Sequence, residues 1–249
     1  MKTKEKVFLS AAALMIGAIG FAQNNDSYID QNGQTQQATV TQTGSHHDSD
    51  VLQIGGFNTA TVNQSGRGNV STVEHDGSQP FKVKRNEATI VQTGDNNYSF
   101  ARSQDGADNV ITTTTTGIEN DAYVKQIGDS NISNIDQDGN VNNAKSTVTF
   151  SDDNESFIIQ DGNTNDTQTS QRGVGFNVST VTTTGNLNKA FTSQNGGNNQ
   201  STVNQMGNLN LSDVSQDGIS HLSTINQTGN NNSSVVTQSG GSSLSVVGQ

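Results

Sequence analysis

Residues 199–216 read NQSTVNQMGNLNLSDVSQ, and this stretch contains two successive copies of an eleven-residue unit. Four positions repeat at that spacing: Asn199 and Asn210, Ser201 and Ser212, Val203 and Val214, and Gln205 and Gln216. Gly207 follows the first glutamine by two positions. The unit therefore reads N-x-S/A-x-V/I-x-Q-x-G-x-x, and a short fixed period of this kind is typical of stacked repeat architectures.

The same period extends outward along almost the whole chain. The glutamines recur at Gln31, Gln42, Gln53, Gln64, Gln126, Gln137, Gln160, Gln171, Gln194, Gln205, Gln216, Gln227, Gln238 and Gln249. Asparagines in phase with them include Asn58, Asn69, Asn131, Asn199, Asn210 and Asn232. Glycines two positions after the glutamine row include Gly33, Gly55, Gly128, Gly207 and Gly229.

Each unit is interpreted as one β-strand and one tight turn. The marked positions alternate, and alternate side chains of a strand point to the same face. A helix would need a period of about 3.6, and Gly, Asn, Thr and Ser form helices poorly. Thr, Val and Ile favour strands, whereas the glycine after the glutamine permits a positive φ in the turn.

Two units make one rung of 22 residues, so the sequence predicts an all-β solenoid of about ten strand-turn-strand rungs. Its two sheets would be parallel and in register, as in cross-β structures. The Val/Ile row would supply a thin apolar core between them. We expect the Asn and Gln rows to form hydrogen-bonded amide ladders in which every amide is paired except at the ends, because an unpaired buried amide is costly.

The composition supports a secreted chain without a conventional globular core. Only 29% of residues are hydrophobic and 5% aromatic. Residues 1–22 resemble a secretory signal peptide: Lys2, Lys4 and Lys6 precede an apolar run at 7–19 that is too short to span a membrane. We therefore divide the chain into this leader and a repeat domain at 23–249, and we expect no membrane span after cleavage.

Charge and cysteine content narrow the function further. The leader holds three lysines and one glutamate, so the remaining chain has nine Lys and Arg, 22 Asp and Glu, and a formal net charge of −13. A chain this acidic repels phosphate, so nucleic acid is not an expected partner. There is no cysteine, hence no disulfide framework.

The period is interrupted at several places. Six extra residues follow His75 and include Pro80, so we predict a bulging insertion loop near 78–85 that carries the basic residues Lys82, Lys84 and Arg85. Single-residue insertions are predicted near 97–104, 151–154 and 173–177. Three other residues stand where the glutamine is expected: Thr115, Val148 and Thr183.

The repeat resembles the curlin repeat of bacterial curli fibre subunits. Good copies are Gln53-x-Gly55-x-x-Asn58, Gln126-x-Gly128-x-x-Asn131 and Gln205-x-Gly207-x-x-Asn210, each followed by Ala or Ser two positions later. The resemblance covers about residues 25–249. The chain departs from the commonest form in its length, with roughly ten rungs where familiar subunits have about five, and in its basic insertion.

This resemblance implies a secreted amyloid subunit that polymerises with itself into extracellular curli, which support biofilm matrix and surface adhesion. Such subunits leave the cell through a dedicated outer-membrane pore, and a minor, nucleating curli subunit templates them. The alternative within the same class is that this chain is itself the minor, nucleating subunit. The first unit follows the leader and the last ends the sequence, so we expect two uncapped strand edges, which are templates for addition.

Other readings compete with self-assembly. A soluble monomeric solenoid could bind ice or another surface through outward threonines such as those in 112–116, although its outward positions also contain Asn, Asp and Lys. The aspartates before glycine, Asp105, Asp138, Asp161 and Asp217, are either turn residues or gatekeeper charges that slow aggregation. The basic loop is either solvated or contacts an acidic partner.

Catalysis has no support in the sequence. We find no nucleophile motif and no enclosed pocket, and we expect no cofactor and no metal site. His47, His75 and His221 stand at Asn or Gln positions, where an imidazole can replace an amide. The predicted assembly residues are therefore the members of the amide rows and the turn glycines.

Overall fold

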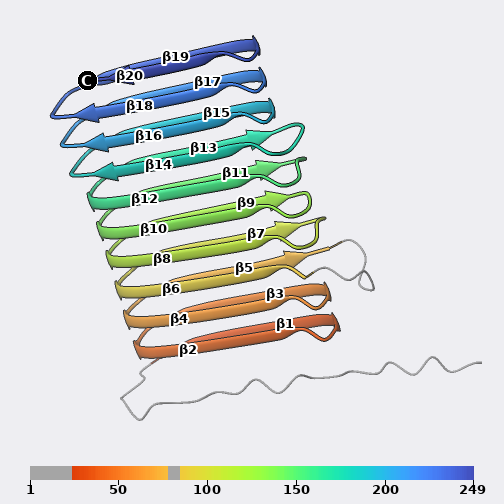
Figure 1. Cartoon of the computed structure of the whole chain (residues 1–249). Helices are drawn as coiled ribbons and strands as arrows, with labels where there is room; N and C mark the ends of the chain where they lie inside the picture. Colours follow the sequence, from red (N-terminus) through yellow and green to blue (C-terminus); the bar gives the residue numbers. More distant parts are fainter. Residues whose placement is uncertain (1–23, 78–84) are drawn as a thin grey trace, which may run out of the picture.

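The computed structural model describes residues 24–77 and 85–249, and the fold in this part of the chain is a stack of β-strands (Figure 1). Twenty strands form two ten-stranded sheets. The odd-numbered sheet contains β1 Asp26–Gln34, β3 Asp48–Gly56, β5 Val70–Asp76, β7 Tyr98–Gln104, β9 Asp121–Ile127, β11 Asn143–Thr149, β13 Asp166–Arg172, β15 Lys189–Gly197, β17 Leu211–Ile219 and β19 Ser233–Gly241. The even-numbered sheet contains β2 Gln37–Ser45, β4 Thr59–Arg67, β6 Glu87–Asp95, β8 Val110–Ile118, β10 Ile132–Asn140, β12 Glu155–Asn163, β14 Val178–Thr184, β16 Gln200–Met206, β18 Leu222–Thr228 and β20 Leu244–Gly248.

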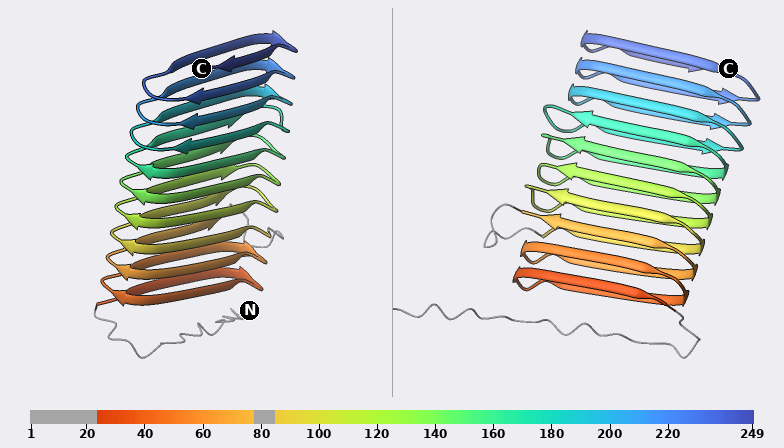
Figure 2. Two further views of the ribbon diagram at one scale, coloured as in Figure 1. Left: turned by 60° about the vertical axis from the view of Figure 1, so that its left-hand side comes forward. Right: turned by 180° about the vertical axis from the view of Figure 1, so that it is seen from behind.

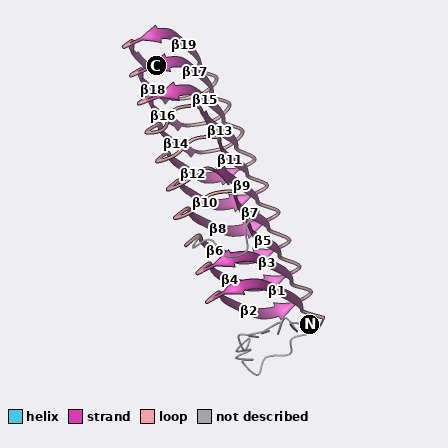
Figure 3. Ribbon diagram, turned by 90° about the vertical axis from the view of Figure 1, so that its right-hand side faces the viewer, coloured by secondary structure: helices cyan, strands magenta, loops and turns pink. Residues whose placement is uncertain are grey.

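Every sheet pairing is parallel and joins strands two apart in the chain, so the predicted β-solenoid is confirmed. Residues of the same repeat position face each other: Gln216 of β17 pairs with Gln238 of β19, and Val214 with Val236. One odd and one even strand make each rung, and the strands within each sheet stay nearly parallel throughout the stack (Figures 2 and 3). The helical alternative is wrong, because the described residues form no helix.

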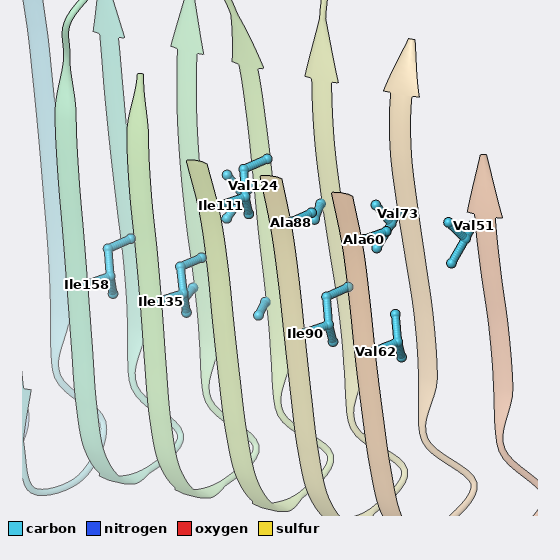
Figure 4. Packing of buried hydrophobic residues seen from close by; sticks show 13 residues of the cluster. Val51, Ala60, Val62, Val73, Ala88, Ile90, Ile111, Val124, Ile135 and Ile158 are labelled. Carbon is cyan, nitrogen blue, oxygen red and sulfur yellow. The ribbon is translucent and has the colours of Figure 1, made fainter. Parts of the chain in front are cut away.

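The core lies between the two sheets and is thin. Side chains alternate between buried and exposed along each strand, as the period of two requires. Val62, Ile90, Ile135 and Val203 are fully buried members of the Val/Ile row. Figure 4 shows such side chains pointing into the space between the sheets. Most other buried residues are Asn, Gln, Ser and Thr, so apolar burial accounts for only part of the interior.

The turns differ from the prediction in one respect. The glycines after the glutamine have positive φ, +119° at Gly207 for example, but a second residue two positions later also has positive φ and is rarely glycine. Val141, Leu187 and Leu209 are such residues, with φ of +57°, +58° and +59°. This conformation costs roughly 1–2 kcal/mol for a residue with a side chain. Cross-rung hydrogen bonds hold it in place, since the Val141 N–H donates to the Ile118 carbonyl at 2.9 Å.

The interruptions leave the stack continuous. β4 pairs with β6 and β5 with β7 on either side of the insertion. The predicted leader and nearly all of the insertion loop, including Pro80, Lys82 and Lys84, lie outside the described residues; Arg85 is exposed. The insertion predicted near 97–104 was misplaced: Ser103, not Gln104, pairs with Gln126, so the extra residue lies in the following turn. Thr115, Val148 and Thr183 occupy glutamine positions.

Candidate self-assembly site

The asparagine ladders tie the turns of successive rungs together. Asn188 is representative: its N–H donates to Asn165 Oδ1 at 3.0 Å, and its Oδ1 accepts the N–H of Asn210 at 3.1 Å. Its Nδ2 donates to the Gly207 carbonyl at 2.8 Å. Asn188 therefore bonds mainly to backbone groups of its neighbours. The amide-to-amide contacts predicted from the sequence also form in these rows, for example from Asn165 Nδ2 to Asn142 Oδ1 at 3.2 Å.

One asparagine row runs without a break through all ten rungs. Its members, in the turns between even and odd strands, are Asn25, His47, Asn69, Asn97, Asn120, Asn142, Asn165, Asn188, Asn210 and Asn232. The other row, in the opposite turns, runs through Asn58, Asn86, Asn109, Asn131, Asn154, Asn177, Asn199, His221 and Ser243. The side chains in both rows are almost all fully buried.

Histidine substitutes for asparagine in these rows without breaking them. The Asn69 N–H donates to His47 Nδ1 at 3.3 Å, and His47 Nε2 donates to the Thr43 carbonyl at 3.0 Å. His221 repeats both contacts with Ser243 and Asp217 at 3.2 Å. The two ring nitrogens thus replace the amide oxygen and amide nitrogen of asparagine.

The glutamine ladders cross-link the two sheets as well as successive rungs. Gln216 Nε2 donates to Gln238 Oε1 at 2.9 Å along the stack and to the Gln200 carbonyl at 2.9 Å across it. Its Oε1 accepts from Gln194 Nε2 at 3.0 Å. Of the predicted members, Gln31, Gln53, Gln126, Gln216 and Gln238 lie in the odd row, and Gln42, Gln64, Gln137, Gln205, Gln227 and Gln249 lie in the even row.

The prediction that every glutamine except those at the ends is paired was wrong. Four buried glutamines have an Oε1 without a partner: Gln126, Gln137, Gln171 and Gln205. In each case the residue one rung earlier is a substitute: Ser103, Thr115, Val148 and Thr183, respectively. A shorter or apolar side chain supplies no donor to the following oxygen, so each substitution ends one segment of the ladder.

Restoring a missing glutamine of the ladder is expected to stabilise the fold. Thr183→Gln would place an amide between Gln160 and Gln205 and give Gln205 Oε1 a donor. The gain should be about 1 kcal/mol, the usual net value of a buried hydrogen bond. A higher denaturant midpoint would report it. Thr180→Gln, on the outer face of the same strand, is the matched control; an equal effect of both substitutions would contradict the ladder explanation.

A third asparagine ladder lies on the exposed edge of the stack and was missed in the sequence. Asn140, Asn163, Asn186, Asn208 and Asn230 form it. The N–H of Asn186 donates to Asn208 Oδ1 at 2.9 Å and its Nδ2 donates to the same atom at 3.1 Å. The motif G-N-x-N at these five turns, separated by 22 or 23 residues, was the signal that could have revealed it.

The candidate gatekeeper aspartates occupy two environments. Asp138, Asp161 and Asp217 are exposed residues within strands and not turn residues, whereas Asp105 lies in a turn with φ of +54°. Asp138 and Asp161 face each other in register. Burial, followed by the charge of Asp138, raises the pKa of Asp136. This cluster of like charges is consistent with a gatekeeper, whereas Asp217 accepts a hydrogen bond from Asn195 Nδ2 at 2.8 Å.

Two features of the structure explain the predicted turn glycines, a positive φ at all five and close approach of the next rung at interior positions such as Gly207. Gly33, Gly55, Gly128, Gly207 and Gly229 all have positive φ. In addition, a Cβ at Gly207 would lie 1.9 Å from the carbonyl oxygen of Gly229, the equivalent glycine one rung later. The rungs therefore approach so closely at this position that no side chain fits between them.

Comparisons with known proteins supply no family assignment. Neither a scan against protein-family models nor a search of curated proteins finds a match for this chain. Within residues 24–77 and 85–249, no three His, Cys, Asp or Glu side chains are grouped so that they could hold a metal ion. The same part of the chain contains no helix that is long and apolar enough to cross a membrane. The fold defines the chain as a β-solenoid with amide ladders.

Proposed function

We propose that this chain is a structural subunit that assembles with itself into curli-like amyloid fibres outside the cell. The observation that carries the proposal is the match between its two end rungs. Among the described residues, β1 and β2 at one end and β19 and β20 at the other are hydrogen-bonded to a neighbouring strand on one side only. An unpaired strand edge is a template for another chain.

The residues of the two ends correspond position by position. Placing β1 of one copy on β19 of another would pair Ser27 with Ser234, Ile29 with Val236, Gln31 with Gln238 and Gly33 with Gly240. Placing β2 on β20 would pair Val40 with Val247 and Gln42 with Gln249. These are the residue types that pair at every interior rung, for example in β17 and β19. A junction between copies would therefore continue the stack.

The ladders also give the stack a direction. Wherever two glutamines pair, the one nearer the β1/β2 end donates Nε2 to Oε1 of the one nearer the β19/β20 end. Each asparagine accepts through Oδ1 from the backbone N–H of the next rung toward β19. One end thus presents Gln238 Nε2 and Asn232 Oδ1, and the other presents Gln31 Oε1 and the N–H of Asn25. We infer that copies join head to tail.

Four parts of the proposal rest on the curlin resemblance alone. They are secretion by a signal peptide, passage through an outer-membrane pore, nucleation by a minor subunit, and roles in biofilm and adhesion.

A second candidate, a monomeric solenoid that binds ice, is favoured by one observation. Three even-sheet strands carry Thr-x-Thr-x-Thr on their outer face: β2, β8 and β14. The strands between β8 and β14 place Asn134, Asp136, Phe157 and Ile159 there, which interrupts a continuous threonine array.

Seeded growth tests the proposal. Purified chain lacking residues 1–22 is expected to assemble after a lag, measured by Thioflavin T fluorescence, and its own sonicated fibres should abolish the lag. Fibre diffraction should show the strand and sheet spacings of about 4.8 and 10 Å. Protein that remains monomeric for days at tens of micromolar, a concentration at which exposed edges normally associate, would contradict self-assembly and favour the monomeric solenoid.

A further inference from the structure

The basic residues of the described chain are concentrated on one surface. Five of the seven described Lys and Arg residues lie in five consecutive odd strands, β7 to β15, one in each. We call these the cationic band: Arg102, Lys125, Lys145, Arg172 and Lys189. The other two are Arg67, at the end of β4, and Arg85. The outer face of the even sheet therefore holds Arg67 as its one described cation, whereas the odd sheet carries five.

The first three strands of the same odd sheet carry an acidic band. It consists of Asp26, Asp30, Asp48, Asp50, Glu74 and Asp76. β1, β3 and β5 contain no Lys or Arg. Asp26 and Asp48 face each other in register, and the pKa of Asp50 is raised by burial and by the charges of Asp48 and Asp26. The acidic band is therefore self-repulsive within a single copy.

The two bands are complementary where they touch. Arg102, at the border of the cationic band, forms ion pairs with Glu74, 3.3 Å from Nε, and with Asp76, 3.3 Å from Nη2. These are the two ion pairs found among the described residues. Lys145 Nζ instead lies 5.3 Å from the centre of the Tyr123 ring. Asp121 and Asp166 lie on the same strands, so the cationic band retains a formal excess of three positive charges.

Head-to-tail stacking would turn this segregation into a regular pattern. β17 adds Asp213 and Asp217, and neither β17 nor β19 contains a cation. In a continuous stack, five odd strands of acidic or neutral character (β17, β19, β1, β3, β5) would alternate with five basic ones. At about 4.8 Å per strand, each band would be roughly 24 Å long. The face would thus carry alternating stripes of equal length.

The same face is suited to burial against a flat partner. Its strands run nearly parallel (Figure 3), and it exposes Tyr28, Tyr98, Leu211 and Val235. The rings of Phe100 and Tyr123 stack at 4.9 Å on it. A shallow groove of about 370 Å³, lined in part by Lys145, Gln168, Phe191 and Asp213, lies in its basic half. Because the whole chain has a formal net charge of −11, two copies attract one another only through a locally complementary surface.

We propose that two stacks of this protein run in opposite directions and pair laterally through the outer faces of their odd sheets, with β9 of one stack opposite β3 of the other, so that each cationic band lies against an acidic band of the neighbour. The partner is a second copy of the chain. The proposal rests on the proposed self-assembly, since the stripes exist as a repeating pattern only in a stack. It assigns different roles to the two sheets: the odd face joins stacks, and the even face remains toward solvent.

Charge reversal tests the lateral contact separately from growth. Lys125→Glu in β9 is compared with Arg67→Glu on the even sheet, which makes the same change in net charge. Growth is read by seeded Thioflavin T fluorescence, and pairing by fibre width in negative-stain electron micrographs. At low ionic strength we expect wild type and Arg67→Glu to form paired stacks, and Lys125→Glu to grow at the wild-type rate but lose most of its pairs. Salt on the order of 0.5 M should separate wild-type pairs, because it screens charges beyond a few ångströms.

A rescue experiment completes the test. Asp50→Lys fibres alone should also lose pairing, whereas mixing them with Lys125→Glu fibres should restore it. Equal pairing of the Lys125→Glu and Arg67→Glu fibres would overturn the lateral contact. So would wild-type stacks that stay single and bind heparin through the cationic band, because the face would then serve an acidic polymer. Absence of fibres altogether would instead overturn the proposed function, and the lateral contact with it.

Discussion

Replacing Gly240 by alanine is expected to stop fibre growth while leaving the monomer folded. Gly240 lies in the last odd strand, where a Cβ meets nothing within 4 Å. At the equivalent Gly218, one rung earlier, a Cβ would lie 1.8 Å from the Gly240 carbonyl oxygen. If the next copy places Gly33 on Gly240, the alanine methyl would collide with that backbone. The φ of +91° at Gly240 adds a local strain of roughly 1–2 kcal/mol in the end rung only.

The expected kinetics are specific. A wild-type seed can accept one mutant chain on its β19/β20 end, and the mutant end thus created accepts no further copy. At the other end, the alanine of the incoming chain blocks docking on Gly33. Seeded Thioflavin T growth should therefore fall to the addition of one copy per seed, with the circular dichroism of the monomer unchanged.

Gly241→Ala is the matched control for this substitution. Nothing lies within 4 Å of its Cβ position either, and Ile219 occupies the equivalent place in β17, so a side chain there is compatible with stacking. This variant should grow at the wild-type rate. Undiminished growth of the Gly240→Ala variant would show that copies do not join with this register.

The second large effect is acid lability caused by His75. This imidazole is fully buried at a glutamine position, 3.5 Å from Gln53 Nε2 through Nδ1, and its Nε2 has no hydrogen-bond partner. Burial lowers its pKa from 6.5 to about 4. Between these values the unfolded chain binds a proton that the folded chain does not, so the folded state loses stability as the pH falls. The loss begins below about pH 6.5 and approaches roughly 3 kcal/mol near pH 4.

His75→Gln should remove this pH dependence and provide an amide for Gln53. The measurement is the denaturant midpoint at pH 7 and pH 5 for wild type and variant. The carboxyls of Asp50, Asp121 and Asp136 have raised pKa values and therefore favour folding as the pH falls, so the informative quantity is the difference between variant and wild type. His46→Gln, at an exposed position, is the control; the same acid loss in the His75→Gln variant would assign the effect to another group.

The fold was predictable because its signal is local and repeated. Within each eleven-residue unit, the alternation of Ser or Ala, Val or Ile, and Gln specifies a strand with one buried face. Gln205, Gln216 and Gln227 follow one another at equal spacing, and this spacing specifies that strands two units apart, such as those of Gln205 and Gln227, stack on each other. The turn conformation was predicted in part: glycine identifies one positive φ, whereas residues such as Val141 and Leu209 have no sequence preference for the other. The contacts of the neighbouring rung impose it.

Which ladders are continuous could be recognised only in the tertiary structure. A glutamine row needs a side-chain amide on both sides of every member, so Thr115 or Val148 leaves a buried oxygen without a donor one rung later. An asparagine row needs from each member a backbone N–H, which every residue except proline supplies, and a side-chain acceptor for the next N–H, which a His ring nitrogen also provides. His47 and His221 therefore join the asparagine rows without interrupting them, and Ser243 is the last member of one row.

The sequence by itself thus determined the strand period, the rung of 22 residues and the identity of the stacked rows. The tertiary structure decided which rows are continuous, where Ser103 replaces a glutamine, and that the cations from Arg102 to Lys189 share one face. The physical reason is the distance along the chain at which each property is defined. Strand alternation is set by neighbours two residues apart, but a ladder partner or a charged neighbour lies 22 or more residues away and depends on the register of every turn between them.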